Sequence, residues 1–316
     1  GVRRCYTACL VTAGDGAIVA GAGQYVGRFA PSPTGPLHAG SLHAAVISWL
    51  DARAAGGRWL LRIEDLDPPR TVPGAADAIR RTLDAHGLHW DAEAPAQSTR
   101  GDAYAAAVET LAEPGLLFHC TCTRRSLRAS GGGYPGTCRD RGLGGDGTGA
   151  AIRLRVDLPA VAFEDRLAGP LELPSGGDFV IRRRDGLWAY QLAVVVDDAD
   201  QGVTDVVRGT DLLPSTPRQI LLLEALGLPR PRYLHHGLVS WRDGTKLSKQ
   251  TGAPAVVDGA ARAGLAAVLA ALGLPDEPRA PVAEQLAQAL PAWSPGPATA
   301  ADRPLETPPG APPGVC

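Results

Sequence analysis

The chain contains two lysines, and they lie three residues apart in the segment "DGTKLSKQTGAP". All the other residues among its 31 basic side chains are arginines, so Lys246 and Lys249 stand out by type and by position. Lysine carries a mobile ammonium with three donors, which can follow phosphate charge as it moves during a reaction. The pair therefore indicates phosphate chemistry, with two lysines on a solvated loop as the alternative.

A second segment whose residues could form a chemical site is "RFAPSPTGPLHAG", residues 28 to 40. Its prolines fix the backbone, and its glycines allow another molecule to approach closely, so the loop is shaped before any ligand binds. A helical pattern begins directly after it, at Ser41. The loop therefore suits a small-molecule site.

Three of the six cysteines lie in "HCTCTRRSLRASGGGYPGTC". Cys120, Cys122 and Cys138 supply three thiolates for a tetrahedral zinc ion but leave one ligand open, for which Tyr134, His119 and a water are candidates. Three free structural cysteines are the alternative. The uneven spacing of all six does not resemble a disulfide framework, which indicates a reducing compartment.

Two acidic clusters, "EDLD" and "DDAD", are expected at strand ends. Their carboxylates could hold a ligand ammonium, a ribose or Mg²⁺. The alternative is that they are solvated loop residues. The clusters comprise Glu64, Asp65 and Asp67, and Asp197, Asp198 and Asp200.

The elements that position these residues follow an α/β pattern. A strand is predicted at residues 24–29, a helix at 41–55 and a strand at "RWLLRI", and the loop leaving the first strand lies where open parallel sheets bind ligands. Helices are predicted at 74–86 and 102–111, followed by an insertion of different composition at 116–177.

The second half of the chain resumes the sheet pattern with "DFVIRR", "YQLAVVVDD" and "VTDVVRG". A helix is predicted in "PSTPRQILLLEALG", with Ser215 or Thr216 as its cap and Gly227 as its stop. Two alanine-rich helices are predicted at 259–272 and 282–289, and the proline-rich segment from Pro291 is predicted to be disordered.

Composition places limits on location and partners. With 45% hydrophobic residues and a net charge of −2, the chain is globular and has no general basic field, so RNA would have to bind local arginine clusters. Such clusters lie at 124–128 and 182–184, although solvated faces are the alternative. Asp15 interrupts the N-terminal apolar run and no 18-residue apolar span occurs, so we expect a cytoplasmic protein without membrane contact.

Taken together, the proline-rich loop and "KLSKQ" resemble the two signature motifs of class I aminoacyl-tRNA synthetases of the glutamyl type. Residues 38–41 occupy the HIGH-like positions and residues 246–250 the KMSKS-like positions. "RIEDLDPPR", "CTCTR" and "GVTDVVRGTDLL" narrow the resemblance to the glutamyl-Q tRNA(Asp) synthetases, truncated paralogues of glutamyl-tRNA synthetase. Three positions depart from the motifs: Ser41, Leu247 and Gln250.

The resemblance implies an α/β fold with a Rossmann-type parallel sheet, a zinc-bearing insertion, a small C-terminal helical stem-contact region and no anticodon-binding domain. It divides the chain into an extension (1–25), a catalytic domain (26–115 and 178–230), an acceptor-type insertion (116–177), a KMSKS-like loop with helices (231–290) and a disordered tail (291–316).

The resemblance also assigns site residues. His38, Lys246 and Lys249 are implied as catalytic, with His38, Gly40 and Lys249 on ATP and Mg²⁺ assisting. Zinc, one structural ion, is assigned to Cys120, Cys122, Tyr134 and Cys138. Glutamate is assigned to Arg28, Phe29, Ala30, Pro31, Ser32, Glu64, Tyr190 and Arg208.

The reaction implied is ATP-dependent formation of glutamyl-adenylate, followed by transfer to queuosine at the wobble position of tRNA(Asp), by a monomer. The chain after Lys249 is short and proline-rich, which favours this acceptor over a tRNA 3′ end read together with its anticodon. A minimal synthetase that charges a 3′ end is the alternative. An inactive tRNA-binding paralogue is a further alternative, against which the intact lysine and histidine positions argue.

Overall fold

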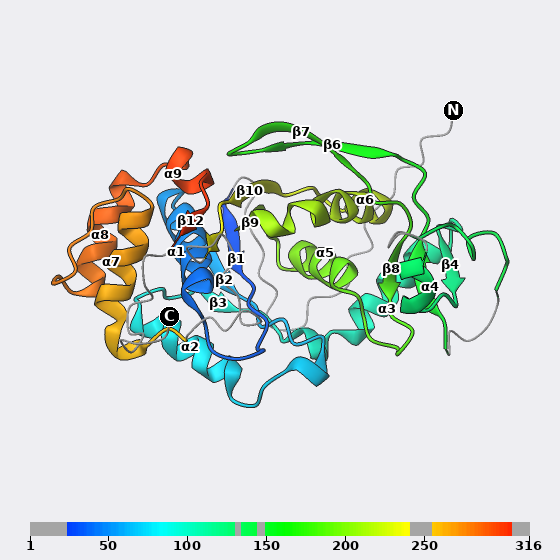
Figure 1. The fold of residues 1–316 in the computed structure, drawn as a ribbon, viewed down its shortest axis with the longest axis horizontal. Helices are drawn as coiled ribbons and strands as arrows, with labels where there is room; N and C mark the ends of the chain where they lie inside the picture. Colours follow the sequence, from blue (N-terminus) through cyan, green and yellow to red (C-terminus); the bar gives the residue numbers. More distant parts are fainter. Residues whose placement is uncertain (1–23, 130–133, 144–148, 241–254, 305–316) are drawn as a thin grey trace.

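The structure is a computed structural model, and it describes residues 24–129, 134–143, 149–240 and 255–304 of the 316. Lys246, Lys249 and Gln250 lie outside these residues, as do the N-terminal extension to residue 23 and the last twelve positions. Figure 1 shows an elongated molecule with a parallel sheet at its centre.

The first half of this sheet contains β1 (Val26–Phe29), β2 (Arg58–Leu61) and β3 (Ala92–Glu93), which are parallel and in that order. Helix α1 (Ala39–Ala54) connects β1 to β2, and α2 (Ala75–Ala85) lies between β2 and β3 in the chain. The predicted strand, helix, strand unit is confirmed. The apolar strands and much of α1, which is buried around most of its circumference, form the main core with Leu50, Trp59 and Leu61.

The second half contains β9 (Asp205–Gly209) and β10 (Arg232–His236), which are also parallel to each other. The Thr204 amide donates to the Val26 carbonyl at 2.9 Å, so the start of β9 lies beside β1. In the sheet, β2 and β3 therefore follow β1 on one side, and β10 follows β9 on the other side, so the strand order reverses between β1 and β9. Such a reversal is where open α/β sheets place their ligands, outside the carboxyl ends of the strands.

Helix α6 (Thr216–Leu226) joins β9 to β10 after a 3₁₀ turn, η3 (Thr210–Ser215). Gly227 ends α6 with φ of 65°, which confirms the predicted stop, because glycine adopts this left-handed conformation without steric penalty. Ser215 takes the cap position, but its side chain does not cap the helix. Within the described residues, the other 3₁₀ turns are η1 (Pro68–Arg70), η2 (Gln97–Thr99) and η5 (Asp258–Ala260).

The segment predicted as an insertion contributes to two sheets. Strands β4 (Leu117–Cys120), β5 (Ala151–Leu154) and β8 (Phe179–Arg182) form a small antiparallel sheet at one end of the molecule, near α3 (Gly101–Ala112) and α4 (Arg124–Ala129). Strands β6 (Ala160–Asp165) and β7 (Gly169–Pro174) form a hairpin whose β6 pairs with β10. This hairpin therefore ties the inserted segment to the central sheet.

At the other end, α7 (Ala261–Ala271) and α8 (Val282–Ala292) lie beside α1. Both predicted alanine-rich helices are confirmed. They add Leu265, Leu269 and Leu286 to the main core.

The prediction of disorder from Pro291 is wrong for the residues that the structure describes. Helix α8 continues to Ala292, and α9 (Pro297–Ala300) and β12 (Arg303–Pro304) follow. Trp293 explains the difference, since its ring is buried and its indole nitrogen donates to Asp51 of α1 at 3.3 Å. Strand β12 pairs with β11 (Val239–Ser240).

The prediction that "YQLAVVVDD" is a strand is also wrong, because these residues begin α5 (Tyr190–Asp200). Its valines favour strands in isolation. In the fold, Leu192 to Asp198 are all buried, and the valines pack against Tyr104 of α3 and Leu222 of α6. Burial on all sides hides the 3.6-residue period that identifies a surface helix.

Among the described residues, no helix is both long and apolar enough to cross a membrane.

Candidate functional site

Four of the residues predicted to bind glutamate meet at the reversal of strand order. Arg28 lies on β1, Glu64 follows β2, Arg208 lies on β9, and Tyr190 is the first residue of α5. Burial raises the pKa of the Tyr190 hydroxyl, and the charges of Arg208, Glu64 and Arg28 also act on it. The parallel strands thus carry these side chains to one edge of the sheet, around the phenol of Tyr190.

A buried ion network surrounds this edge, with Asp198 of α5 at its centre. Arg28 Nε donates to Asp198 Oδ1 at 3.1 Å, and Arg62 Nη1 donates to the same oxygen at 2.7 Å. Arg62 also donates to Glu64 Oε1 at 3.2 Å and to Gln201 Oε1 at 2.8 Å. Because the Arg62 side chain is fully buried, its partners have fixed positions.

The carboxylates of Asp198 and Glu64 differ in how far the neighbouring arginines compensate their buried charge. Burial alone would raise the pKa of Asp198, but Arg28 and Arg62 outweigh burial and lower it. For Glu64, burial raises the pKa, and the opposing effects of Arg62 and Arg28 do not cancel it. Asp198 is therefore a stable anion, whereas the ionised form of Glu64 would gain from a further cation.

Arg208 is held from three directions and is 5% exposed. Its Nε donates to His235 Nε2 at 3.1 Å, its Nη1 to Gln219 Oε1 at 2.8 Å and its Nη2 to Thr216 Oγ1 at 2.8 Å. The guanidinium therefore has a defined plane before any ligand binds.

The proline-rich loop lies next to this network. Phe29 is buried and stacks on Trp59, with ring centroids 6.1 Å apart. Ala30 and Pro31 are half-buried and Ser32 is exposed. The Pro31 carbonyl accepts from the Glu64 amide at 3.0 Å, which holds the loop against the network.

His38 is the N-cap of α1, and its Nδ1 accepts from the Ser41 amide at 3.2 Å. In a neutral imidazole the proton is then on Nε2, which makes that nitrogen a donor. Gly40 lies in the first turn, at the end of the helix that attracts anions. His38 also forms a β-bridge with Ala255, so the described chain resumes beside this loop. Lys246 and Lys249 lie outside the described residues.

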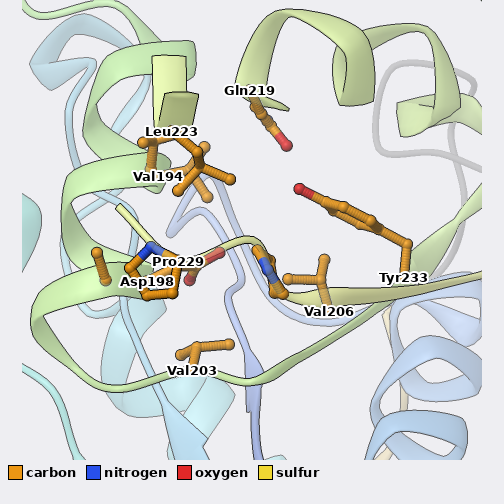
Figure 2. Close-up of a pocket in the computed structure, with 11 residues that line it drawn as sticks. Val194, Asp198, Val203, Val206, Gln219, Leu223, Pro229 and Tyr233 are labelled. Carbon is orange, nitrogen blue, oxygen red and sulfur yellow. The ribbon is translucent and has the colours of Figure 1, made fainter. Parts of the chain in front are cut away.

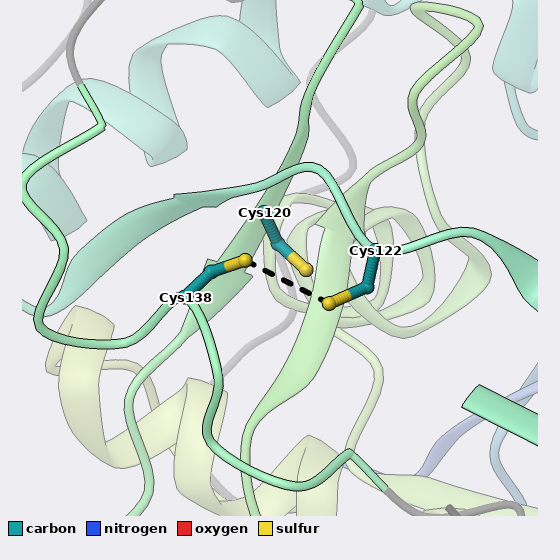
Figure 3. Close-up of side chains that lie close together, drawn as sticks. All are labelled: Cys120, Cys122 and Cys138. Carbon is teal, nitrogen blue, oxygen red and sulfur yellow. Dashed lines mark hydrogen bonds between the residues drawn. The ribbon is translucent and has the colours of Figure 1, made fainter. Parts of the chain in front are cut away.

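The three thiols predicted to bind metal come together beneath β4. Their Sγ atoms all lie within 4.8 Å of one another, and those of Cys122 and Cys138 are 3.7 Å apart (Figure 3). A tetrahedral zinc ion with Zn–S bonds of 2.3 Å separates its sulfurs by about 3.8 Å. The cluster could thus hold such an ion. His119 is no ligand here, because adjacent β4 residues face opposite sides and Cys120 takes the buried side.

Tyr134 lies next to the thiols. Its hydroxyl accepts from the Cys138 amide at 2.6 Å, and burial together with the neighbouring thiols raises its pKa to about 12. Burial raises the pKa of the Cys138 thiol, but hydrogen bonds from the Thr121 backbone and Cys122 outweigh burial and lower it to about 7. Cys138 is therefore closer to its thiolate form than Cys122, whose pKa burial and the neighbouring thiols raise to about 11.

A small pocket lies behind the ion network, between α5, α6 and the strands β9 and β10. Figure 2 shows Gln219 and Tyr233 pointing into one space, with Asp198 at its border. The pocket has room for about one water molecule, so it is not a site for glutamate or ATP.

Each arginine of the run at 182–184 contacts a nearby residue. Arg183 pairs with Asp185 at 2.6 Å, and Arg184 donates to the Thr121 carbonyl at 3.4 Å. Arg182 stacks on Trp188. These contacts place the run close to the thiol cluster, at the same end of the molecule.

The sequence patterns did not single out Arg62. For the acidic clusters, they left solvated loop residues open as an alternative. In the structure, Asp197 and Asp198 are buried, and Asp65 accepts from Ser98. Arg62 carried a readable signal, since it lies between the apolar residues Leu61 and Ile63, directly after the apolar strand β2. A guanidinium inside such a run requires a buried partner of opposite charge.

Comparison with known proteins identifies the family of the chain. The family described as tRNA synthetases class I (E and Q), catalytic domain, matches residues 24–134 and 139–267. The protein named Glutamyl-Q tRNA(Asp) synthetase of Pseudomonas putida KT2440 is 54% identical over 278 residues, covering 86% of this chain and 92% of that protein. Its namesake in Pseudomonas aeruginosa PAO1 is 55% identical over 273 residues, covering 85% and 92%.

Among solved structures, the glutamate-tRNA synthetase from Elizabethkingia anophelis is similar with a TM-score of 0.72 and 26% identity. The alignment covers 84% of this chain and 65% of that synthetase, so this chain spans less than two thirds of its length. The chain therefore belongs to the class I tRNA synthetases for glutamate and glutamine, in the family of the glutamyl-Q tRNA(Asp) synthetases.

Proposed function

We propose that this enzyme activates glutamate with ATP and transfers it to the queuosine base at the wobble position of tRNA(Asp). A glutamate carboxylate oxygen attacks the α-phosphate, and pyrophosphate leaves. A hydroxyl of the acceptor then attacks the acyl carbon of the adenylate, and AMP leaves. The observation that carries the proposal is the meeting of Arg28, Glu64, Tyr190 and Arg208 at the reversal of strand order.

The site suits an amino acid with an acidic side chain. Arg28 and Arg208 present guanidinium groups, which bind carboxylates through paired hydrogen bonds. Glu64 receives the substrate ammonium, which supplies the extra cation that its buried carboxylate needs. Tyr190 and the loop residues Phe29, Ala30, Pro31 and Ser32 complete the walls of this site.

Adenylate formation is assigned to the adjoining loop. His38 Nε2 donates to phosphate oxygens, and the amides near Gly40 at the start of α1 add further donors. Lys246 and Lys249 neutralise charge on the α-phosphate and the leaving pyrophosphate. Mg²⁺ bound to ATP supplies further neutralisation of phosphate charge.

We further propose that Cys120, Cys122, Cys138 and Tyr134 hold one structural zinc ion. The sulfur separations support this assignment, and the Tyr134 hydroxyl already lies against the Cys138 amide. The residues around the cluster pin the end of β4 to the segment at 134–138, which orders this end of the molecule for tRNA.

A second candidate function is supported by the likeness to glutamate-tRNA synthetases of known structure. In that function the same adenylate would be transferred to the 3′ adenosine of a tRNA. The acceptor distinguishes the two functions, because the activation step is common to both.

The experiment incubates the protein with ATP, Mg²⁺, labelled glutamate and queuosine-containing tRNA(Asp), and then locates the label by mass spectrometry of RNA fragments. We expect label on the anticodon nucleoside and none on tRNA(Asp) that lacks queuosine. Label on the 3′ adenosine would replace the proposal by the second function. Glutamate-dependent ATP–pyrophosphate exchange, lost in Lys249→Ala, should accompany either result, and its absence in the wild type would indicate a binding protein.

A further inference from the structure

A buried chain of hydrogen bonds leads from the β6–β7 hairpin to Arg208. Asp165, the last residue of β6, is fully buried, and its Oδ1 accepts from the amides of Leu167 and Ala168 at 2.9 and 3.0 Å. Its Oδ2 accepts from the His235 amide at 3.1 Å and lies 2.7 Å from His235 Nδ1. His235 on β10 is 4% exposed and meets Arg208 on its other side.

The direction of each hydrogen bond follows from the chemistry of arginine. A guanidinium nitrogen donates and does not accept, so His235 Nε2 accepts from Arg208 Nε. The imidazole proton is then on Nδ1 and is donated to Asp165. Burial lowers the pKa of His235 by more than the bond to Asp165 raises it, which agrees with a neutral ring.

Three hydrogen bonds hold the Arg208 guanidinium, one from Nε and one from each Nη. Each Nη carries two hydrogens, so one bond from each nitrogen leaves donor capacity for a ligand. A carboxylate accepts from two such N–H groups at once. Among the hydrogen bonds of the described residues, the one to His235 holds Nε, the atom that connects the guanidinium to its flexible stem.

We propose that Asp165 and His235 are positioning residues for glutamate recognition: they hold the Arg208 guanidinium in the plane that accepts the substrate carboxylate. The inserted hairpin β6–β7 thereby takes part in amino acid selection without touching the substrate. The inference rests on the proposed role of Arg208 in binding glutamate.

The test compares His235→Leu with His235→Gln. Glutamine places an amide oxygen near the position of Nε2 and can accept from Arg208, whereas leucine cannot. Glutamate affinity is measured by isothermal titration calorimetry, and KM and kcat for glutamate and for ATP are measured by ATP–pyrophosphate exchange. Thermal unfolding confirms that each variant is folded.

We expect His235→Leu to raise Kd and KM for glutamate about tenfold, the loss of one charged hydrogen bond, with KM for ATP unchanged. His235→Gln should return glutamate affinity to within about threefold of the wild type. Asp165→Asn should also raise both values, because an amide has one accepting oxygen where both carboxylate oxygens accept, and its NH2 group would face N–H donors. If His235→Leu does not fold, Asp165→Asn and His235→Gln decide the question in the same assays.

Equal weakening of glutamate and ATP binding in the folded variants, or unchanged glutamate affinity in all of them, would overturn the inference. Failure of the proposed function is a separate result: wild-type protein would then bind no glutamate and show no exchange, and the inference would fall with it.

Discussion

The ion network around Asp198 and the thiol cluster around Cys138 are both buried and polar, yet they are built in opposite ways. The network joins α5 to β1 and to the segment after β2, and both lie more than a hundred residues before α5 in the chain. The thiols all lie within residues 120–138. In the network, Arg28 and Arg62 compensate the charge of Asp198, and Glu64 alone would gain from a further cation. Thiolates repel one another and need a cation from outside. The first region is therefore largely compensated by its own side chains, and the second is proposed to hold a metal.

Removing Asp198 tests how far the network depends on its shared anion. Asp198→Ala leaves Arg28 and Arg62 buried without their shared anion, so the free energy of unfolding should fall by about 3–5 kcal/mol. Urea unfolding measures this change. The control is Asp200→Ala on the same helix, whose half-exposed carboxylate pairs with Arg100 and should contribute less than about 1 kcal/mol. Equal losses in both variants would contradict the special role of Asp198.

The free energy of unfolding should fall in acid, because several histidines are buried. Burial lowers the pKa of His236 on β10 to about 4, so the folded protein binds fewer protons than the unfolded chain between pH 6.5 and 4. Stability is complete above this window and falls as the pH decreases through it, by on the order of 3 kcal/mol from this residue. Burial also lowers the pKa values of His235 and His86, which adds to the fall.

Urea unfolding between pH 7 and 4 measures this dependence. His236→Phe should flatten it, whereas the exposed control His89→Gln should not. Repeating the series with a chelator separates histidine titration from metal loss at the thiol cluster. A pH dependence that disappears with the chelator would assign it to the thiols instead.

Tyr134→Phe tests whether the phenolic oxygen of Tyr134 is a ligand in the proposed zinc site. If the phenolic oxygen is a ligand, this change should reduce zinc affinity at least about 10- to 100-fold, the range seen even for residues that only support a ligand. Competition with a chromogenic chelator gives the affinity. Zinc binding equal to that of the wild type would mean that a water completes the site, and Cys138→Ser serves as the control that loses the ion.

The smallest effect is expected at an exposed ion pair, which sets a baseline for both regions. Arg80 on α2 contacts Glu93 and Asp77 at 2.6 Å, and its side chain is 34% exposed. Arg80→Ala should lower the free energy of unfolding by less than about 1 kcal/mol. A loss as large as that of Asp198→Ala would show that burial does not explain the network.

Much of the fold could be predicted from local patterns. The unit formed by β1, α1 and β2 formed as predicted, because its apolar segments are bounded by glycine and proline. Helix α5 did not, because a run of valines buried on every side carries no period from which its state can be read. Trp293 likewise lies in a proline-rich segment whose order depends on a distant partner, Asp51.

The features of the candidate site also fall into two groups, those that local sequence predicts and those that only the tertiary structure brings together. The sequence by itself determined the types and spacing of the motif residues, the three close cysteines and the family to which they point. The tertiary structure alone decided that Arg62 and Asp198 meet, that His235 links Asp165 to Arg208, and which of the acidic side chains are buried. The physical reason is distance along the chain: short-range contacts leave a pattern in neighbouring residues, whereas charge pairs across the sheet exist only after the strands are side by side.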